Sequence, residues 1–138
     1  MSIDSDVSSI DIAAYDLHLV EPVLRVRNVE ETVEWYRTRL GFAVDFIWGE
    51  PAEHAGVSAT GNGGCVRIQF SVGLADGIEP TVTGWLMIRV GADIDRLYEA
   101  YKARGVVIVR AIDTRPWGLR DFDILDCNGH VLRFAGEV

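Results

Sequence analysis

The chain contains one pattern twice, and this internal repeat limits the possible folds more than any other feature. A shift of 64 residues aligns Arg25 with Arg89 and the segment 66–70 with 130–134. One offset therefore relates both the beginnings and the ends of the two halves. Such self-similarity predicts that the same supersecondary unit is built twice.

Each half begins with an apolar strand and continues with a helix. Asn28 is the expected N-cap of the first helix, with Glu31 as its capping-box partner, and Gly41 is the expected end. Asp93 and Gly105 have the same places in the second half. Three strands should follow each helix, at 42–48, 54–60 and 64–72 in the first half and at 106–112, 118–126 and 130–135 in the second. The unit is βαβββ, so the chain is expected to be an α+β protein.

The last two strands should form a hairpin. Asn128-Gly129 favours a type I′ turn, in which both residues adopt positive φ. Leu132 and Phe134 then share one face of the final strand, and Arg133 points to the other. A guanidinium in this otherwise apolar strand needs an explanation.

The repeat also predicts the domain boundaries. Residues 1–16 hold four aspartates and no basic residue, and should form a mobile tail or an arm lying on a partner subunit. Residues 17–138 should form one domain. Its modules are 17–72 and 83–138, joined by a linker at 73–82.

Composition excludes several classes of function. The formal net charge of −8 disfavours nucleic acid as a partner, because phosphate neutralisation needs a basic surface. No apolar run has the length of a membrane span, and the N-terminus has no signal-peptide pattern. Cys65 and Cys127 do not make a disulfide framework. We therefore expect a cytoplasmic protein with no membrane partner.

Several motifs resemble those of the vicinal oxygen chelate superfamily, which includes glyoxalase I, extradiol dioxygenases and bleomycin resistance proteins. The opening segments 22–28, 32–36 and 40–42 carry the resemblance, as do Phe122, Asp126, Gly129 and Phe134 at the close. Cys127 departs from the usual proline of the closing motif. The resemblance implies two curved sheets that form a half-open cup, with helices on the convex side. It also implies a small-molecule ligand in the cup and a homodimer.

Metal-dependent members of this family place ligands on the first and last strand of each module. The matching residues here are Glu21, Gln69, Trp85 and Arg133, with Arg67 as an alternative to Gln69. The indole of Trp85 offers no lone pair, and Arg133 is a permanent cation. The three histidines, His18, His54 and His130, share no ligand spacing and are expected at the surface or in the core. We therefore predict no metal and no cofactor.

A metal-free cup would instead be lined by aromatic and arginine side chains. The predicted ligand-binding residues are Glu21, Arg25, Phe46, Trp48, Gln69, Trp85, Arg89, Trp117 and Arg133. Aromatic walls suit planar ligands. Two questions stay open: Trp48 and Trp117 fit either the core or the rim of the cup, and the arginines could pair with acids of the chain or with a ligand anion. The charge of the ligand is therefore undetermined at this point.

The resulting prediction is a metal-free small-molecule binding protein, related to the bleomycin resistance branch, that sequesters an aromatic or drug-like compound. The alternative is a divergent glyoxalase-like or dioxygenase-like enzyme. Glu21 would then be its base or ligand, and no other catalytic residue is identified. A role as an accessory structural domain is a third possibility.

Overall fold

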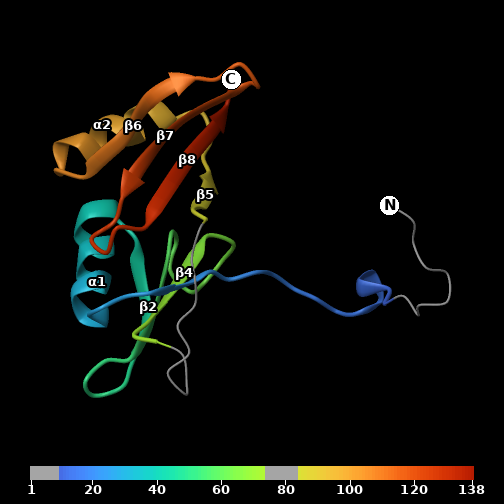
Figure 1. Cartoon of the computed structure of the whole chain (residues 1–138), viewed down its shortest axis with the longest axis vertical. Coiled ribbons are helices and arrows are strands. Elements are labelled where there is room, and N and C mark those ends of the chain that lie inside the picture. Colours follow the sequence, from blue (N-terminus) through green and yellow to red (C-terminus); the bar gives the residue numbers. More distant parts are fainter. Residues whose placement is uncertain (1–9, 74–83) are drawn as a thin grey trace.

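The computed structural model describes residues 10–73 and 84–138. Most of the predicted linker, like the first nine residues, lies outside these ranges. The first module contains β1 (Val23–Arg25), α1 (Val29–Trp35), β2 (Ala43–Trp48), β3 (His54–Ser58) and β4 (Arg67–Ser71). The second contains β5 (Leu86–Arg89), α2 (Ile94–Ala103), β6 (Val107–Thr114), β7 (Leu119–Leu125) and β8 (Val131–Glu137). Figure 1 shows the two modules one above the other, with residues 10–20 extending away from both.

The two sheets have the same topology, which confirms the predicted pair of βαβββ modules. Their strand orders are β1-β4-β3-β2 and β5-β8-β7-β6. The parallel pairs also have the same register, because Val23 lies opposite Gln69 in one sheet and Met87 opposite Arg133 in the other. Both members of the second pair follow the first by 64 residues, so the offset found in the sequence is also a structural one.

The offset changes in the third strand of each module. Ala55 pairs with Phe70 in the first sheet, and Phe122 pairs with Phe134 in the second. The offset is therefore 67 for β3 and β7 but remains 64 for β4 and β8. As a result, the structural equivalent of Gly56 is Asp123.

The first helix is capped as predicted, but the second is not. The Asn28 side chain accepts a hydrogen bond from the Glu31 amide at 2.9 Å, and α1 continues into a π-helical turn at Tyr36–Leu40. Gly41 ends this turn with φ of 82°, a conformation that favours glycine. Asp93 occupies the N-cap position of α2, but its side chain makes no capping hydrogen bond. Its Oδ2 instead forms an ion pair with Arg96 Nη2 at 3.4 Å.

The turn between β7 and β8 differs from the predicted type I′ turn. Gly129 has φ of 86°, whereas Asn128 is not among the described residues with positive φ. The Asp126 carboxylate explains the difference, because its Oδ1 accepts hydrogen bonds from the amides of Asn128 and His130, both at 2.8 Å. A side chain thus organises this turn.

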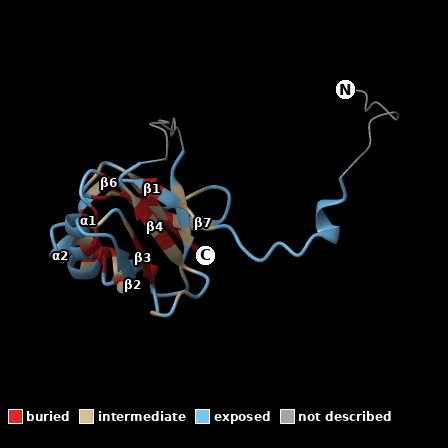
Figure 2. Cartoon of the chain, turned by 90° about the horizontal axis from the view of Figure 1, so that it is seen from below, coloured by how far each residue is buried: buried red, intermediate tan, exposed pale blue. Residues whose placement is uncertain are grey.

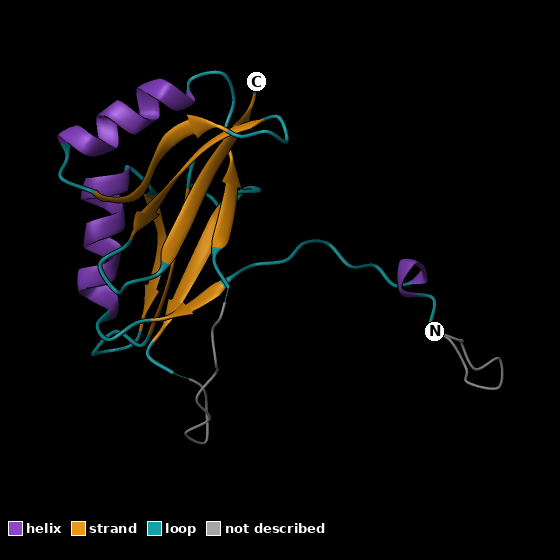
Figure 3. Cartoon of the chain, turned by 45° about the horizontal axis from the view of Figure 1, so that its top comes forward, coloured by secondary structure: helices purple, strands orange, loops and turns teal. Residues whose placement is uncertain are grey.

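The helices cover one face of the sheets and leave the other face open. Figure 3 shows α1 and α2 on one side of the strands, and Figure 2 shows buried residues concentrated in the strands and beneath the helices. Phe122 and Phe134 stack in the core with ring centroids 5.3 Å apart. Leu24 and Val26, at the beginning of the first module, are buried as well. No helix in residues 10–73 or 84–138 combines the length and apolar character needed to cross a bilayer.

Hydrogen bonds between distant residues join the two modules. The Tyr36 hydroxyl donates to Asp126 Oδ2 at 2.7 Å, and the Tyr101 hydroxyl donates to the Leu40 carbonyl at 3.1 Å. Burial is the main cause that raises the pKa of Tyr36 well above its usual value, followed by the Asp126 charge. Both hydroxyls are thus neutral donors at neutral pH.

This burial predicts a loss of stability at alkaline pH. Burial raises the pKa of Tyr101 from 10.0 to about 12. Between these values the unfolded chain releases its proton before the folded chain does, so the free energy of unfolding falls as pH rises. At about 1.4 kcal/mol per pH unit, Tyr101 should account for a loss of ~2 to 3 kcal/mol. Urea unfolding at several pH values measures this effect. The free energy of unfolding of Tyr101→Phe should fall less steeply with pH than that of the wild type. Tyr15→Phe is the control and should behave like the wild type, because Tyr15 is exposed.

Candidate functional site

Alternation along the strands determines which side chains face the open side. In β4, Ile68 and Phe70 are buried against the helix side, so Arg67, Gln69 and Ser71 face the opposite way. Strand pairing extends this face to β3, because Gly56 lies opposite Gln69 and His54 opposite Ser71. In β2, Phe46 pairs with Gly56 and Trp48 with His54.

Three adjoining pockets of small-molecule size lie along this face. One of about 420 Å³ is lined by Phe46, Trp48, Glu53, His54, Ser71, Val72 and Gly73. A second of about 380 Å³ shares Phe46 and adds mainly Glu21, Asp45, Asn62, Arg67 and Gln69. A third of about 410 Å³ shares Arg67 with the second and reaches Met87 and Arg89 of the second module. We call these three pockets together the groove.

A continuous polar network runs through the groove. Gln69 Nε2 donates to Glu21 Oε2 at 3.1 Å, so its Oε1 is left to accept from His54 Nε2. A carboxylate only accepts, so the donors run in one order, from His54 Nε2 to Gln69 and from Gln69 Nε2 to Glu21. In the neutral imidazole, Nδ1 of His54 is then the acceptor. At the other end, Arg67 Nε lies 2.6 Å from Glu21 Oε1 as an ion pair without hydrogen-bond geometry.

Phe46 forms the wall between two of the pockets. Its ring lies over Gly56, so close that a Cβ at that glycine would come within 2.5 Å of a Phe46 ring carbon. The ring also stacks with His54, with centroids 5.7 Å apart and planes inclined by 14°. Phe46 is 41% exposed, which leaves part of it available to a ligand. Gly56 is thus the residue that allows the aromatic wall to lie flat on the sheet.

On the open face of the second sheet, the central group is a charged pair of Arg133 and Asp123. Arg133 donates from Nε and Nη2 to the two oxygens of Asp123, at 2.7 and 3.0 Å. Its guanidinium also lies 5.2 Å from the centre of the Trp85 ring. The hydrogen bonds to Asp123 raise the pKa of Arg133. The arginine that was unexplained in the sequence therefore has both a carboxylate and an aromatic partner.

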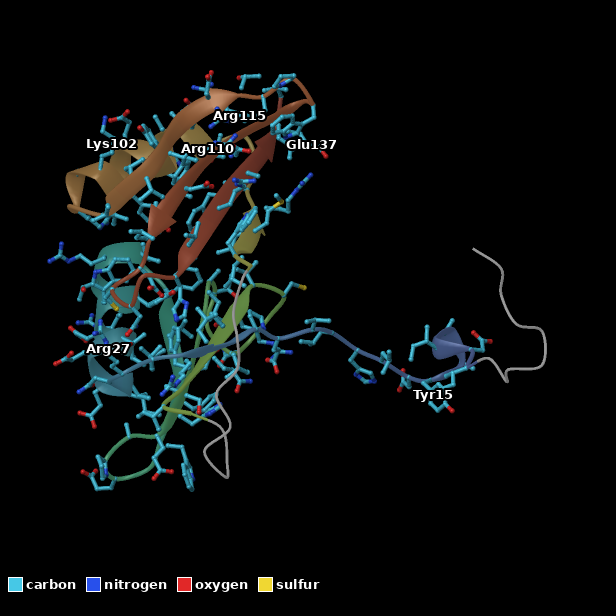
Figure 4. All side chains as sticks on the ribbon, viewed as in Figure 1. Tyr15, Arg27, Lys102, Arg110, Arg115 and Glu137 are labelled. Carbon is cyan, nitrogen blue, oxygen red and sulfur yellow. The ribbon has the colours of Figure 1, made fainter. Side chains whose placement is uncertain are left out.

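A second acid on this face is fully buried among arginines. Asp121 Oδ1 accepts from Arg115 Nε at 2.7 Å and lies 3.6 Å from Arg110 Nη1. Its Oδ2 is buried without a donor among the described residues. Figure 4 shows Arg110 and Arg115 on the C-terminal sheet. The arginine charges are thus compensated within the chain rather than exposed in the cup.

The structure brings some predicted site residues together and separates others. Glu21, Phe46, Trp48, Gln69 and Arg89 line the groove. Trp85 and Arg133 pair on the second sheet, and Trp85 lines a separate pocket of about 220 Å³. Arg25 lines another pocket with Asn128, and Trp117 lies in the β6–β7 turn and is largely exposed. Trp48 is also exposed, so neither tryptophan belongs to the core.

Sequence reasoning missed several polar residues of the open face. His54 was expected at the surface or in the core, and it lies within the polar network. Asp121 and Asp123 were not considered as partners of the arginines. Their alternation with the buried Phe122 and Ile124 was the signal that would have placed both aspartates on the open face.

The four positions equivalent to metal ligands do not fit a divalent ion. Both oxygens of Glu21 are engaged, Trp85 has no lone pair, and Arg133 is held by Asp123. Among residues 10–73 and 84–138, no three His, Cys, Asp or Glu side chains gather as a metal site would require.

Repeated modules, matching registers and an open face with pockets together define the class of protein. A family model described as the Glyoxalase/Bleomycin resistance protein/Dioxygenase superfamily matches residues 17–134, and the chain belongs to this superfamily. No curated protein matches the sequence.

Solved structures with the same fold carry diverse descriptions. A glyoxalase-related enzyme from Clostridium phytofermentans is 25% identical, with 91% of this chain and 98% of that chain covered and a TM-score of 0.71. TioX from Micromonospora sp. ML1 is 21% identical, with coverage of 89% and 100% and a TM-score of 0.67. The fosfomycin resistance protein FosX from Listeria monocytogenes is 14% identical, with coverage of 90% and 96% and a TM-score of 0.65.

Proposed function

We propose that this protein binds an uncharged, planar aromatic small molecule in the groove, without a metal or other cofactor, and acts by sequestering it. The observation that carries the proposal is the wall formed by Phe46, stacked on His54 and shared by two pockets. A planar ligand can continue this stack, and pockets of about 400 Å³ are of the size that small ligands occupy. The resistance proteins of the superfamily make an antibiotic the leading type of ligand.

The distribution of charge supports an uncharged ligand. At the centre of the groove, Glu21 and Arg67 pair with each other at 2.6 Å. A charged group on a ligand lying between the Phe46 wall and this pair would have to break the pair or remain uncompensated, and both are costly at a partly buried site. Polar groups on a neutral ligand could still hydrogen-bond to His54 or Gln69.

Three compounds of one shape test the proposal by calorimetry. Phenazine is uncharged, N-methylphenazinium is a cation, and phenazine-1-carboxylate is an anion. We expect phenazine to bind most tightly, with the same affinity before and after treatment with EDTA. The proposal fails if neither phenazine nor other neutral planar aromatics bind, if a charged analogue binds tenfold more tightly, or if binding requires added metal.

A second candidate function is enzymatic, and the polar network is the observation that favours it. His54 presents Nδ1 as an acceptor, while Gln69 links its other nitrogen to Glu21. Such an arrangement orients a general base. Glu21 is the less accessible base, because both of its oxygens are already engaged. Glyoxalase-type isomerisation and extradiol cleavage assays test this candidate: turnover that His54→Ala abolishes supports it, and no turnover of either substrate class leaves sequestration.

A further inference from the structure

Residues 10–20 form an arm that leaves the body of the protein. Figures 1 and 2 show this arm extending away from both modules, and Figure 4 places Tyr15 far from them. In Figure 3 the arm departs on the side opposite the helices, which is the side of the open face. Its described hydrogen bonds, such as Ala14 to Asp11 and His18 to Asp16, stay within the arm.

The arm has the composition of a segment that is covered by protein. Six large apolar side chains are each more than half exposed: Ile10, Ile12, Tyr15, Leu17, Leu19 and Val20. Apolar side chains this dense on an extended segment mark a contact surface rather than a solvated tail. The first twenty residues also contain four aspartates and no lysine or arginine.

A complementary surface lies on the open face of the C-terminal sheet. Trp85, just before β5, and Met87 on β5 are about half exposed, and so are Val107 and Val109 on β6. These apolar residues flank the central arginine–aspartate cluster from both edges of the sheet. Arg89 stands beside them and is exposed, and its partner Glu137 is 3.5 Å away and more exposed still. The sheet therefore offers apolar contacts to an apolar segment, beside the exposed Arg89–Glu137 ion pair.

We propose that the arm of one copy crosses the open face of the C-terminal sheet of a second copy, and that the exchange is reciprocal. The arm contains a short 3-10 turn at Ile12–Ala14, and with its other eight residues extended it reaches roughly 32 Å. Four strands about 4.8 Å apart require less than half of that length. Reciprocal exchange gives a two-fold dimer in which the same surfaces are used twice. This interaction specifies the interface of the predicted homodimer. Met87 and Arg89 also line the third pocket of the groove, whereas the Phe46 wall of the proposed ligand site belongs to the other sheet.

The first test is the oligomeric state of the full chain. Sedimentation equilibrium should give a dimer, and Leu17→Asp with Leu19→Asp should raise its dissociation constant at least tenfold. Both residues are exposed in the single chain, so the fold should persist, and circular dichroism checks this. Ile47→Asp is the control, because Ile47 is half exposed and lies on the edge strand β2 of the other sheet. A monomeric wild type, or a dimer that the arm substitutions leave intact, would overturn the proposal.

The second test identifies the surface that the arm contacts. Cys65 and Cys127 are replaced by serine, and one tagged chain carries Leu17→Cys while a differently tagged chain carries Met87→Cys. Mixing the two under mild oxidation should give disulfide-linked heterodimers. Val44→Cys, on the edge strand β2 of the other sheet, is the control position and should link poorly. If a chain carrying both Leu17→Cys and Met87→Cys closes only a disulfide within itself, the arm folds back and the proposal is wrong.

Discussion

Asp126→Ala is expected to lower the free energy of unfolding by about 3 to 5 kcal/mol, a large part of the stability of a small domain. Asp126 is buried, and its two oxygens together accept from the Tyr36 hydroxyl and from the amides of Asn128 and His130. Removing the carboxylate leaves all three donors without this partner. It also breaks the link between the first helical segment and the turn of the second module.

Urea unfolding at neutral pH measures this effect, and Asp95→Ala is its matched control. Asp95 accepts three hydrogen-bond contacts from Arg120, but its side chain is 61% exposed. Exposed ion pairs contribute about 0 to 1 kcal/mol, so the control should lie near the wild type. If Asp126→Ala is no more destabilising than Asp95→Ala, the buried carboxylate does not have the structural role assigned to it.

Phe46→Ala should weaken binding of phenazine by about 10- to 30-fold, since truncating an aromatic anchor removes about 1.4 to 2 kcal/mol of binding free energy. Phe46 is partly exposed, so its loss should affect stability less than binding. Trp117→Ala should have a smaller effect on binding, because Trp117 lies in the β6–β7 turn and lines none of the three pockets of the groove.

Gly56→Ala tests the same wall without removing any aromatic atom. The new Cβ would meet the Phe46 ring at 2.5 Å, so the ring must swing away from the sheet and from His54. We expect weaker phenazine binding together with a nearly unchanged unfolding free energy. Gly91→Ala is the control, because a Cβ there has no neighbour within 4 Å. Unchanged affinity in both Gly56→Ala and Phe46→Ala would exclude the groove as the site of stacking.

Much of the fold was predictable because its signals are local. Asn28 and Gly41 mark the ends of the first helical segment through capping and positive φ, which depend on a few neighbouring residues. Strand alternation correctly placed Leu132 and Phe134 on one face and Arg133 on the other, and the first two are buried in the core. The internal repeat indicated that these local signals belong to two copies of one module. The registers of the parallel strand pairs in both sheets confirm the offset of 64 residues.

Predictions failed where a particular side-chain contact, either within the turn or between strands, overrode the sequence pattern. The turn at Asn128-Gly129 does not adopt the predicted type I′ conformation, because the Asp126 carboxylate accepts hydrogen bonds from the amides of Asn128 and His130. Asp123 went unnoticed because the third strand follows an offset of 67, so a shift of 64 places Arg120 at the position of Gly56. His54 was assigned by its lack of ligand spacing, whereas its actual partner, Gln69, is on a neighbouring strand.

The two modules, their helices and the faces of the strand residues could be predicted from local patterns, because periodicity and capping act over a few residues. Which charges neutralise one another, and which aromatic residues share a pocket, could be established only from the three-dimensional arrangement. Those pairings depend on strand order and register, which bring together residues as far apart as Glu21 and Gln69. Arg133 illustrates both levels: alternation placed it on the open face, and the neighbouring strand supplied Asp123 as its partner.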